Sequence, residues 1–248
     1  MIKPGRFLDR IHFRDSYLAM REAKAEKILK VLRKHKADMS HASVADIGCS
    51  RGHITRRLTE EFDFVVGLDL DHEDRNLTSG FHFIQADGCS LPLASATFDV
   101  VLINHIVEHV SSPQRLLDEV WRVLKADGVC YLACPNRLSL VEPHYRLPLL
   151  SWLPRPLANA YVRLTGRGER YLDNSPTYWG LRKLTRKFRV LDQTRLILKN
   201  PDEYLDDDPS LKKQAGWLRW FPEWVLSMLV PFFPVWVLIL KKEASSSQ

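Results

Sequence analysis

Three aspartates that follow short apolar runs could bind different parts of one ligand. Asp46 comes just before a glycine turn, where a carboxylate suits a ligand ammonium better than a pyrophosphate. Asp69 comes about 20 residues later, a spacing at which a carboxylate accepts hydrogen bonds from the hydroxyls of a ribose. Asp87, followed by Gly88, can accept a hydrogen bond from an adenine amine. The three acids predict a site for an adenosine that carries an amino-acid group.

The turn after Asp46 contains Gly48, Ser50 and Gly52 and leads into residues that can begin a helix. Such a junction is expected to offer free backbone N–H groups to a ligand, because the first amides of a helix have no internal partner. Three uses compete for it: a nucleotide-type cofactor site, a hydrolase nucleophile elbow, or a plain structural turn. The segment 48–52 does spell G-x-S-x-G, but a hydrolase needs several strands before its elbow, and only a helix precedes this one. An oxidoreductase is disfavoured because the G-x-G-x-x-G fingerprint is absent.

Helices and apolar strands must position these residues. Residues 15–36 show helical periodicity. Their basic side could contact a membrane or an acidic substrate, but a solvated outer face is the favoured interpretation. After the turn, short apolar strands alternate with a helix that begins at Pro113. This alternation predicts an α/β fold with a mostly parallel sheet and helices on both faces, in which strand ends share one edge. Asn104 lies at that edge as well. The predicted strands are 44–47, 64–69, 81–86, 98–103 and 129–134.

Taken together, these motifs resemble the class I S-adenosylmethionine-dependent methyltransferases, in particular the small-molecule branch with the ubiquinone and menaquinone enzymes. The likeness runs from Ser43 to Asn136, and Ser50 replaces a glycine usual in the family. It implies a Rossmann-like methyltransferase sheet with a terminal antiparallel strand, and S-adenosylmethionine as cofactor. The matching stretches are 44–53, 65–71, 85–88, 91–93, 98–101, 108–110, 117–128 and 134–136. The expected cofactor-binding residues are Asp46, Gly48, Ser50, Gly52, Asp69, Asp87, Gly88 and Asn104.

Methyl transfer asks the protein mainly for alignment, and for a base when the acceptor is a hydroxyl. The candidates at the end of the fourth strand are His105 and His109, with Glu108 between them. His105 is expected to face the methyl group. The alternative for Glu108 and His109 is that they cap or pack the next helix. No metal site is expected, since the four cysteines form no C-x-x-C pair, and no disulfide framework is indicated.

The second half is expected to select the substrate, and the whole chain 1–248 to form one domain. We divide it into a helical cap (1–42), a cofactor-binding core (43–136), a substrate lid or insertion (137–187) and C-terminal strands with an apolar helix (188–248). Helices are expected at 157–165 and 177–188, and strands at 189–191 and 195–198. Arginines and aromatic residues of this half could hold an apolar substrate with an anionic group.

Tryptophans recur at helical spacing near the C-terminus, over 217–229, with Pro222 placed to open the helix proper. An apolar run at 235–240 fits a terminal strand. Trp-rich apolar segments bounded by lysines are also typical of membrane contact. We therefore expect a cytoplasmic enzyme, since 1–6 precede no signal-like apolar run. For 217–240 the alternatives are burial, peripheral contact with the inner membrane face, and a membrane anchor. The acceptor is expected to be small or lipid-linked and not a nucleic acid, despite a net charge of +6. The alternative is a non-catalytic protein that keeps the cofactor fold and serves as a membrane-associated binding module.

Overall fold

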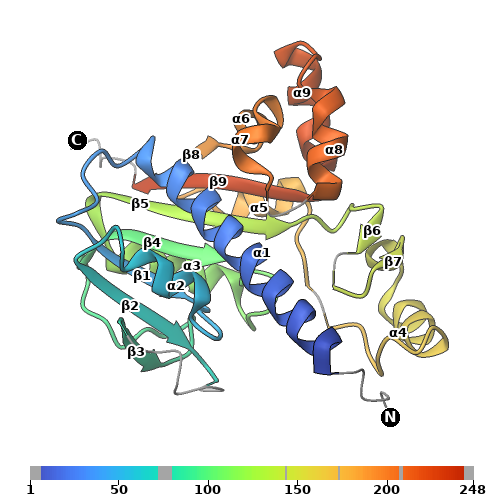
Figure 1. Ribbon diagram of the computed structural model, residues 1–248, viewed down its shortest axis with the longest axis horizontal. Helices are drawn as coiled ribbons and strands as arrows, with labels where there is room; N and C mark the ends of the chain where they lie inside the picture. The colour runs from blue at the N-terminus through green and yellow to red at the C-terminus, as the bar shows by residue number, and fades with distance from the viewer. Residues whose placement is uncertain (1–6, 72–79, 143, 173, 207–208, 243–248) are drawn as a thin grey trace.

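A seven-stranded sheet with the order β3-β2-β1-β4-β5-β9-β8 forms the centre of the molecule (Figure 1). The computed structural model describes residues 7–71, 80–142, 144–172, 174–206 and 209–242. Strands β1 to β5 run parallel, and β9 pairs antiparallel with both β5 and β8. The predicted mostly parallel sheet with a terminal antiparallel strand is confirmed. The strands are β1 Ser43–Ile47, β2 Phe64–Asp69, β3 His82–Gln85, β4 Phe98–Asn104, β5 Leu124–Pro135, β8 Phe188–Asp192 and β9 Val235–Lys242.

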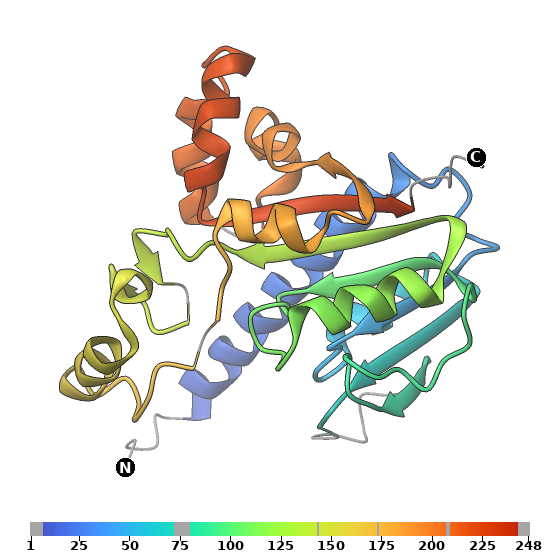
Figure 2. The same ribbon diagram turned by 180° about the vertical axis from the view of Figure 1, so that it is seen from behind.

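Helices cover both faces of this sheet. The long α1 (Phe7–Arg33) crosses one face together with α2 (His53–Leu58), and α3 (Pro113–Val123) and α5 (Tyr178–Leu184) lie on the other (Figure 2). Helix α3 begins as its sequence predicts, with Pro113 in its first turn and the Ser112 hydroxyl accepting a hydrogen bond from the Arg115 amide. It ends at Val123, one residue before β5 begins, so Leu124 belongs to the strand.

One prediction for the last third was wrong, and another was confirmed. Residues 195–198 lie in a helix, α6 (Thr194–Lys199), because Asp192 accepts a hydrogen bond from the Thr194 amide and starts a helical turn there. The helical stripe over 217–229 spans the end of α8 (Pro209–Leu218) and the whole of α9 (Glu223–Leu229), and Pro222 stands at the start of α9, as the sequence predicts. Between α6 and α8 lies the short α7 (Pro201–Tyr204), and the 3-10 turn η3 (Val230–Phe232) leads into β9.

The segment after β5 forms a small unit beyond the sheet, which we call the inserted unit. It contains β6 (Val141–Glu142), β7 (Leu147–Pro148), the 3-10 turn η2 (Leu150–Trp152) and α4 (Arg155–Leu164). It packs around an apolar cluster of its own that includes Leu150, Ala158 and Val162. The single-domain division of the chain stays a prediction. The sequence also predicts a poor helix between Asp71 and Gly80, and Pro143 as the first of several prolines that punctuate an apolar stretch. Residues 72–79 and 143 lie outside the described residues, as do residues 1–6.

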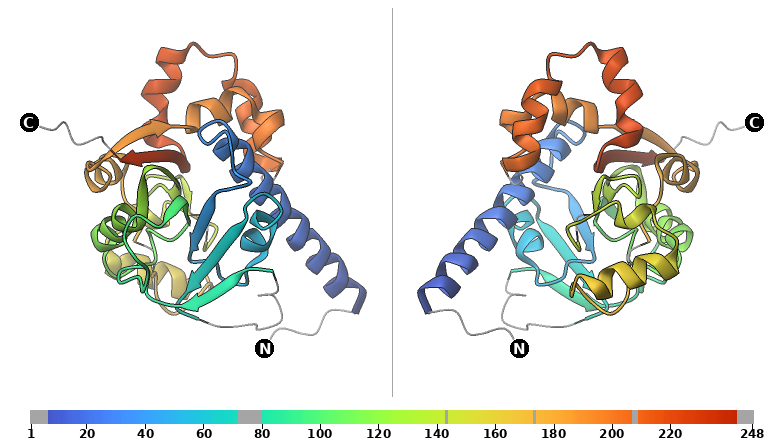
Figure 3. Two further views of the ribbon diagram at one scale, coloured as in Figure 1. Left: turned by 90° about the vertical axis from the view of Figure 1, so that its left-hand side faces the viewer. Right: turned by 90° about the vertical axis from the view of Figure 1, so that its right-hand side faces the viewer.

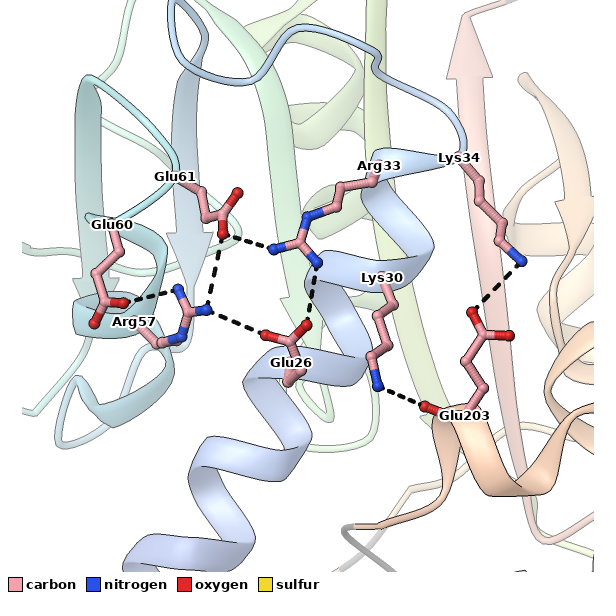
Figure 4. A network of polar contacts seen from close by, with 8 residues as sticks. All are labelled: Glu26, Lys30, Arg33, Lys34, Arg57, Glu60, Glu61 and Glu203. Carbon is pink, nitrogen blue, oxygen red and sulfur yellow. Dashed lines mark hydrogen bonds and ion pairs between the residues drawn. The ribbon is translucent and has the colours of Figure 1, made fainter.

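A network of ion pairs fixes α1 against its neighbours (Figure 4). Arg33 pairs with Glu26 at 3.1 Å and with Glu61 at 2.6 Å, and Arg57 reaches Glu26 at 3.1 Å, which joins α1 to α2 and its C-terminal turn. On the other side of α1, the Lys30 ammonium donates to the backbone carbonyl of Glu203 at 2.8 Å. Each exposed pair contributes little alone, but the set holds α1 in one position along the sheet.

The buried carboxylate of Asp99 ties β4 to the loop before β1, and we predict that its loss destabilises the fold. Burial by itself raises the pKa of Asp99, but hydrogen bonds from Lys125, Ser43 and Lys36 outweigh it and hold the pKa below the ordinary value. Asp99→Asn should therefore lower the free energy of unfolding by about 2 kcal/mol at neutral pH. Because the folded pKa is depressed, this stabilisation is present above about pH 4 and disappears at lower pH.

Urea unfolding of the variant and the parent as a function of pH measures this difference. Asp127→Asn is the matched control, because Asp127 pairs with the same Lys36 at 3.7 Å but is 79% exposed. Equal losses in the two variants would contradict the role assigned to Asp99.

Candidate active site

The residues predicted to bind a ligand meet where β1, β2 and β4 end. Asp46 pairs in register with Gly67 of β2 and Leu102 of β4, so its side chain lies at the centre of the sheet. It is buried, and its carboxylate accepts a hydrogen bond from the Thr55 hydroxyl of α2 at 2.6 Å. Burial raises the pKa of Asp46 to about 7, the Thr55 bond opposes this rise, and the nearby Asp69 adds to it.

The glycine turn is held tightly against β2. Gly48, Ser50 and Gly52 have φ values of 79°, 49° and 74°, all in the left-handed region. The amides of Gly48 and Cys49 donate to the Leu68 carbonyl at 2.7 and 3.0 Å, and the Ser50 amide donates to the Asp69 carboxylate at 2.7 Å. The expected free N–H groups are therefore engaged at residues 48–50, because the turn folds back on β2. What the turn offers a ligand is its shape and the carboxylate of Asp69.

The other two predicted acidic positions lie along the same edge of the sheet. Asp69 ends β2, and its second carboxylate oxygen accepts a hydrogen bond from the Asp71 amide at 3.1 Å. Asp87 follows β3, is exposed, and accepts a hydrogen bond from the Cys89 amide at 2.8 Å. Gly88 packs so close to Ile47 and Leu116 that a Cβ there would lie 3.1 and 3.2 Å from their side chains. The carboxylates of Asp69 and Asp87 are thus each held by a backbone amide, and Gly88 is held by close packing.

A small cavity of about 40 Å³ opens beside the turn and is lined by Asp46, Gly48, Ser50 and Asn104. Helix α1 contributes Tyr17 and Arg21 to the lining of this cavity, and the Arg21 Nε donates a hydrogen bond to the Tyr17 hydroxyl at 3.0 Å. Neither residue was predicted from the sequence, because the basic side of this helix was expected to lie in solvent. The periodicity of α1 gave no sign that this side reaches the ends of the strands.

Positive charge surrounds the same cavity. The pKa of His53, which lines it, is lowered by burial and then by Arg21, Arg51 and Arg56. A ligand group near these side chains is favoured if it is an anion. One small cavity therefore offers a carboxylate for an ammonium at Asp46 and a guanidinium for a carboxylate at Arg21. These are the two charged groups of an amino acid.

His105, the residue after Asn104, does not line the small cavity. His105 lines a second cavity of about 210 Å³ on the other side of the end of β4. Its φ is 60°, its amide donates to the Ala133 carbonyl at 2.9 Å, and its Nδ1 lies 3.3 Å from a carboxylate oxygen of the buried Glu108. Burial, and then the charges of Lys24 and Lys27, lower the pKa of His105 well below its usual value. The imidazole is neutral at pH 7.

His109, the other predicted base, does not line this second cavity. It is exposed, and its ring packs against that of His144 from the inserted unit at a centroid distance of 5.1 Å. Ligand atoms of Glu108, His109 and His144 lie within 4.8 Å of one another, a spacing that a metal ion can bridge. Protein contacts account for this grouping, because His144 pairs with the buried Glu142 at 2.9 Å and Glu108 with His105. The expectation of no metal stays a prediction.

This sheet order, with one antiparallel strand and acids at the ends of β1 and β2, defines the Rossmann-like fold of the class I S-adenosylmethionine-dependent methyltransferases. Residues 45–132 match the family model Methyltransf_11, a methyltransferase domain. The predicted family and its cofactor, S-adenosylmethionine, are confirmed. The acids, the arginine and the cavity described above fit the ammonium, carboxylate and ribose of that molecule.

Curated relatives support the same class. The chain is 38% identical over 125 residues to a malonyl-[acyl-carrier protein] O-methyltransferase of Enterobacter lignolyticus, which covers 49% of each protein. It is 28% identical over 167 residues to the enzyme of that name from Pectobacterium atrosepticum, covering 65% of this chain and 59% of the relative. The chain thus spans only about half the length of the curated relatives it matches.

Solved structures show the same fold over nearly the whole chain. A possible histamine N-methyltransferase of Thermotoga maritima aligns with a TM-score of 0.54 and 18% identity, covering 96% of this chain and 97% of that one. The plantazolicin methyltransferase BpumL, solved with a substrate analogue and S-adenosylhomocysteine, aligns with a TM-score of 0.58 and 18% identity, covering 96% and 90%.

We predict that the affinity for S-adenosylmethionine rises with pH because of Asp46. A protonated Asp46 cannot attract an ammonium, and its pKa of about 7 places this loss near neutrality. The dissociation constant should therefore increase by up to about tenfold per pH unit below pH 7. Calorimetric titration across this range measures it. Asp46→Asn should bind more weakly than the parent above pH 7, approach the parent's affinity at lower pH and so have a flatter pH profile, and an unchanged slope in that variant would contradict the assignment.

Proposed function

We propose that this protein transfers a methyl group from S-adenosylmethionine to a small or lipid-linked acceptor. The observation that carries the proposal is that consecutive residues at the end of β4 line two cavities, Asn104 the smaller one and His105 the larger one. The smaller cavity has the charges for the amino-acid part of the cofactor, whose sulfonium supplies an activated methyl group when it is bound. The larger cavity provides space for an acceptor next to a neutral imidazole.

Calorimetry with S-adenosylmethionine and with NAD tests the cofactor first. We expect binding of the first and not of the second. A labelled methyl donor is then incubated with the protein and extracted lipids and metabolites, and S-adenosylhomocysteine is quantified. The names of the two curated relatives make oxygen the first acceptor atom to examine. If S-adenosylmethionine binds but no mixture yields S-adenosylhomocysteine, the alternative of a non-catalytic binding module stands in place of the enzyme.

We propose that the protein carries out this reaction at a membrane surface. Helices α8 and α9 stand out from the body of the molecule (Figure 3) and expose Trp217 and Trp224, which are 79% and 67% accessible. Trp220, Met228 and Phe232 are exposed on the same segment. Large exposed aromatic groups of this kind partition into the interface between lipid and water. Within the described residues, no helix has the length and apolarity needed to cross a bilayer. Contact would therefore be peripheral.

We predict that the protein floats with liposomes and that the tryptophans are responsible. Vesicles of phosphatidylglycerol and phosphatidylcholine should carry the parent protein to the top of a density gradient at low salt, and Trp217→Ser with Trp224→Ser should reduce the bound fraction severalfold. The control is Trp152→Ser, because Trp152 is also exposed but lies in the inserted unit. Equal flotation of all three proteins, or none by the parent, would contradict membrane contact through α8 and α9.

The segment 137–187, which contains the inserted unit, is proposed as the lid over the acceptor. The inserted unit lies beyond the ends of the parallel strands, where its helix α4 projects from the sheet (Figure 1). Arg155 of α4 binds the Tyr171 carbonyl and the Asn174 side chain, so the unit is tied to the chain segment that returns to α5.

A further inference from the structure

The larger cavity joins an apolar wall to a basic rim. Its wall is formed by Ile197 and Leu198 of α6, by Leu205 after α7, and by Val235 and Val237 of β9. Lys24 and Lys27 of α1 form the rim, and His105 lies at the end of β4. Wall and rim come from distant parts of the chain, and the ion-pair network of α1 holds them together (Figure 4).

The two lysines are directed at the cavity and not at the opposite side of α1. Both are half-buried and both line the cavity, and their charges act on the imidazole of His105. One helix therefore serves both cavities, with Tyr17 and Arg21 at the smaller one and Lys24 and Lys27 at the larger one. A ligand in the larger cavity meets two positive charges beside hydrocarbon.

The size of the cavity limits what can enter. Pockets that enclose a whole drug-sized ligand measure about 300 to 1,000 Å³, whereas this one measures about 210 Å³. It has room for a ring or a short stretch of chain. A longer molecule would leave the rest of its chain outside, and α8 with its exposed tryptophans borders this cavity through Leu211.

We propose that this cavity binds the methyl acceptor and that the acceptor is an anionic amphiphile, with an apolar ring or chain against α6 and β9 and a carboxylate or phosphate between Lys24 and Lys27. This inference rests on the proposed function only in calling the ligand an acceptor. The binding site itself can be tested without turnover, because the charge and the apolar wall determine what binds.

The experiment measures binding of octyl phosphate, octanol and octylammonium by calorimetry to the full chain. The parent should bind octyl phosphate at least tenfold more tightly than octanol. Lys24→Gln with Lys27→Gln should remove this preference, and Lys24→Glu with Lys27→Glu should shift it to octylammonium. Arg182→Gln with Lys183→Gln is the matched control, because these exposed α5 residues lie outside the cavity and their loss removes the same charge.

A second variant tests the wall. Leu211→Ser, at the half-buried outer side of the cavity, should weaken octyl phosphate and octanol alike by severalfold while the preference for phosphate remains. S-adenosylmethionine binding is measured on every variant and should not change. If it is retained while octyl phosphate binds no better than octanol, or binds equally to the lysine variants, the acceptor site is refuted and the methyltransferase remains. If S-adenosylmethionine fails to bind the parent, the proposed function is refuted whatever octyl phosphate does.

Discussion

Gly48→Ala is expected to weaken S-adenosylmethionine binding by about 100-fold. A Cβ at this position would lie 1.9 Å from the Cδ1 of Ile106, and the backbone has φ of 79°, which side-chain-bearing residues rarely adopt. Overpacking of this kind costs about 1 to 3 kcal/mol and the left-handed backbone about 1 to 2 kcal/mol. A factor of ten in affinity corresponds to about 1.4 kcal/mol. The strain falls on the turn between Asp46 and Asp69, so both acids lose their places.

A double variant separates the clash from the backbone strain. In Gly48→Ala with Ile106→Ala the nearest remaining contact is the Cβ of residue 106, at an ordinary 3.6 Å. This variant should recover part of the affinity. Gly166→Ala is the matched control, because Gly166 also has a positive φ, 66°, but a Cβ added there would meet nothing within 4 Å. Calorimetry gives the affinities and thermal unfolding shows that each variant is folded. A folded Gly48→Ala protein with parental affinity would remove the turn from the cofactor site.

The sequence was sufficient for the central sheet because its strands are marked locally. Strands β1, β2 and β4 are short apolar runs with a polar residue at or next to the end, and these residues are Asp46, Asp69 and Asn104. Parallel pairing then brings the ends to one edge without further information. The positions of the acids could therefore be predicted before any contact was known.

The strand expected at 195–198 shows where local patterns fail. A short apolar run fits a buried strand and a buried helix turn equally well. What decides here is the carboxylate of Asp192 at the start of α6 and the packing of Ile197 and Leu198, which are almost fully buried. Neither is visible as periodicity in so few residues.

Helix α1 shows the second kind of failure. Its basic side predicts a solvated face, yet Arg21 faces one cavity, and Lys24 and Lys27 face another. The reason is tertiary, because contacts with α2, with the turn after α2 and with α7 fix the helix across the ends of the strands. These contacts are Glu26 with Arg57, Arg33 with Glu61, and Lys30 with the Glu203 carbonyl. Charged residues at helical spacing look the same whether water or a ligand cavity lies in front of them. Only the path of the helix across the sheet tells them apart.

His105→Ala is expected to lower turnover by about 100 to 10,000-fold, the contribution typical of a positioned general base, with S-adenosylmethionine affinity unchanged. The buried carboxylate of Glu108, 3.3 Å from Nδ1, favours a proton on that nitrogen and leaves Nε2 to accept one from a hydroxyl acceptor. The side chain lines the larger cavity, whereas its neighbour Asn104 lines the smaller one. Removing the imidazole therefore affects the acceptor side alone.

His105→Asn makes this test specific, because the backbone of His105 has φ of 60° and asparagine accepts the left-handed region more readily than alanine. It should fold as stably as the parent and still lose turnover to the same extent as His105→Ala. His41→Ala is the control for a histidine at the surface, where it pairs with Asp63 and is 82% exposed. Glu108→Gln should reduce turnover less, since it changes the orientation of the ring and leaves the base in place. Full activity in His105→Asn would mean that the acceptor loses no proton to this side chain, and that alignment at the end of β4 is sufficient for the transfer.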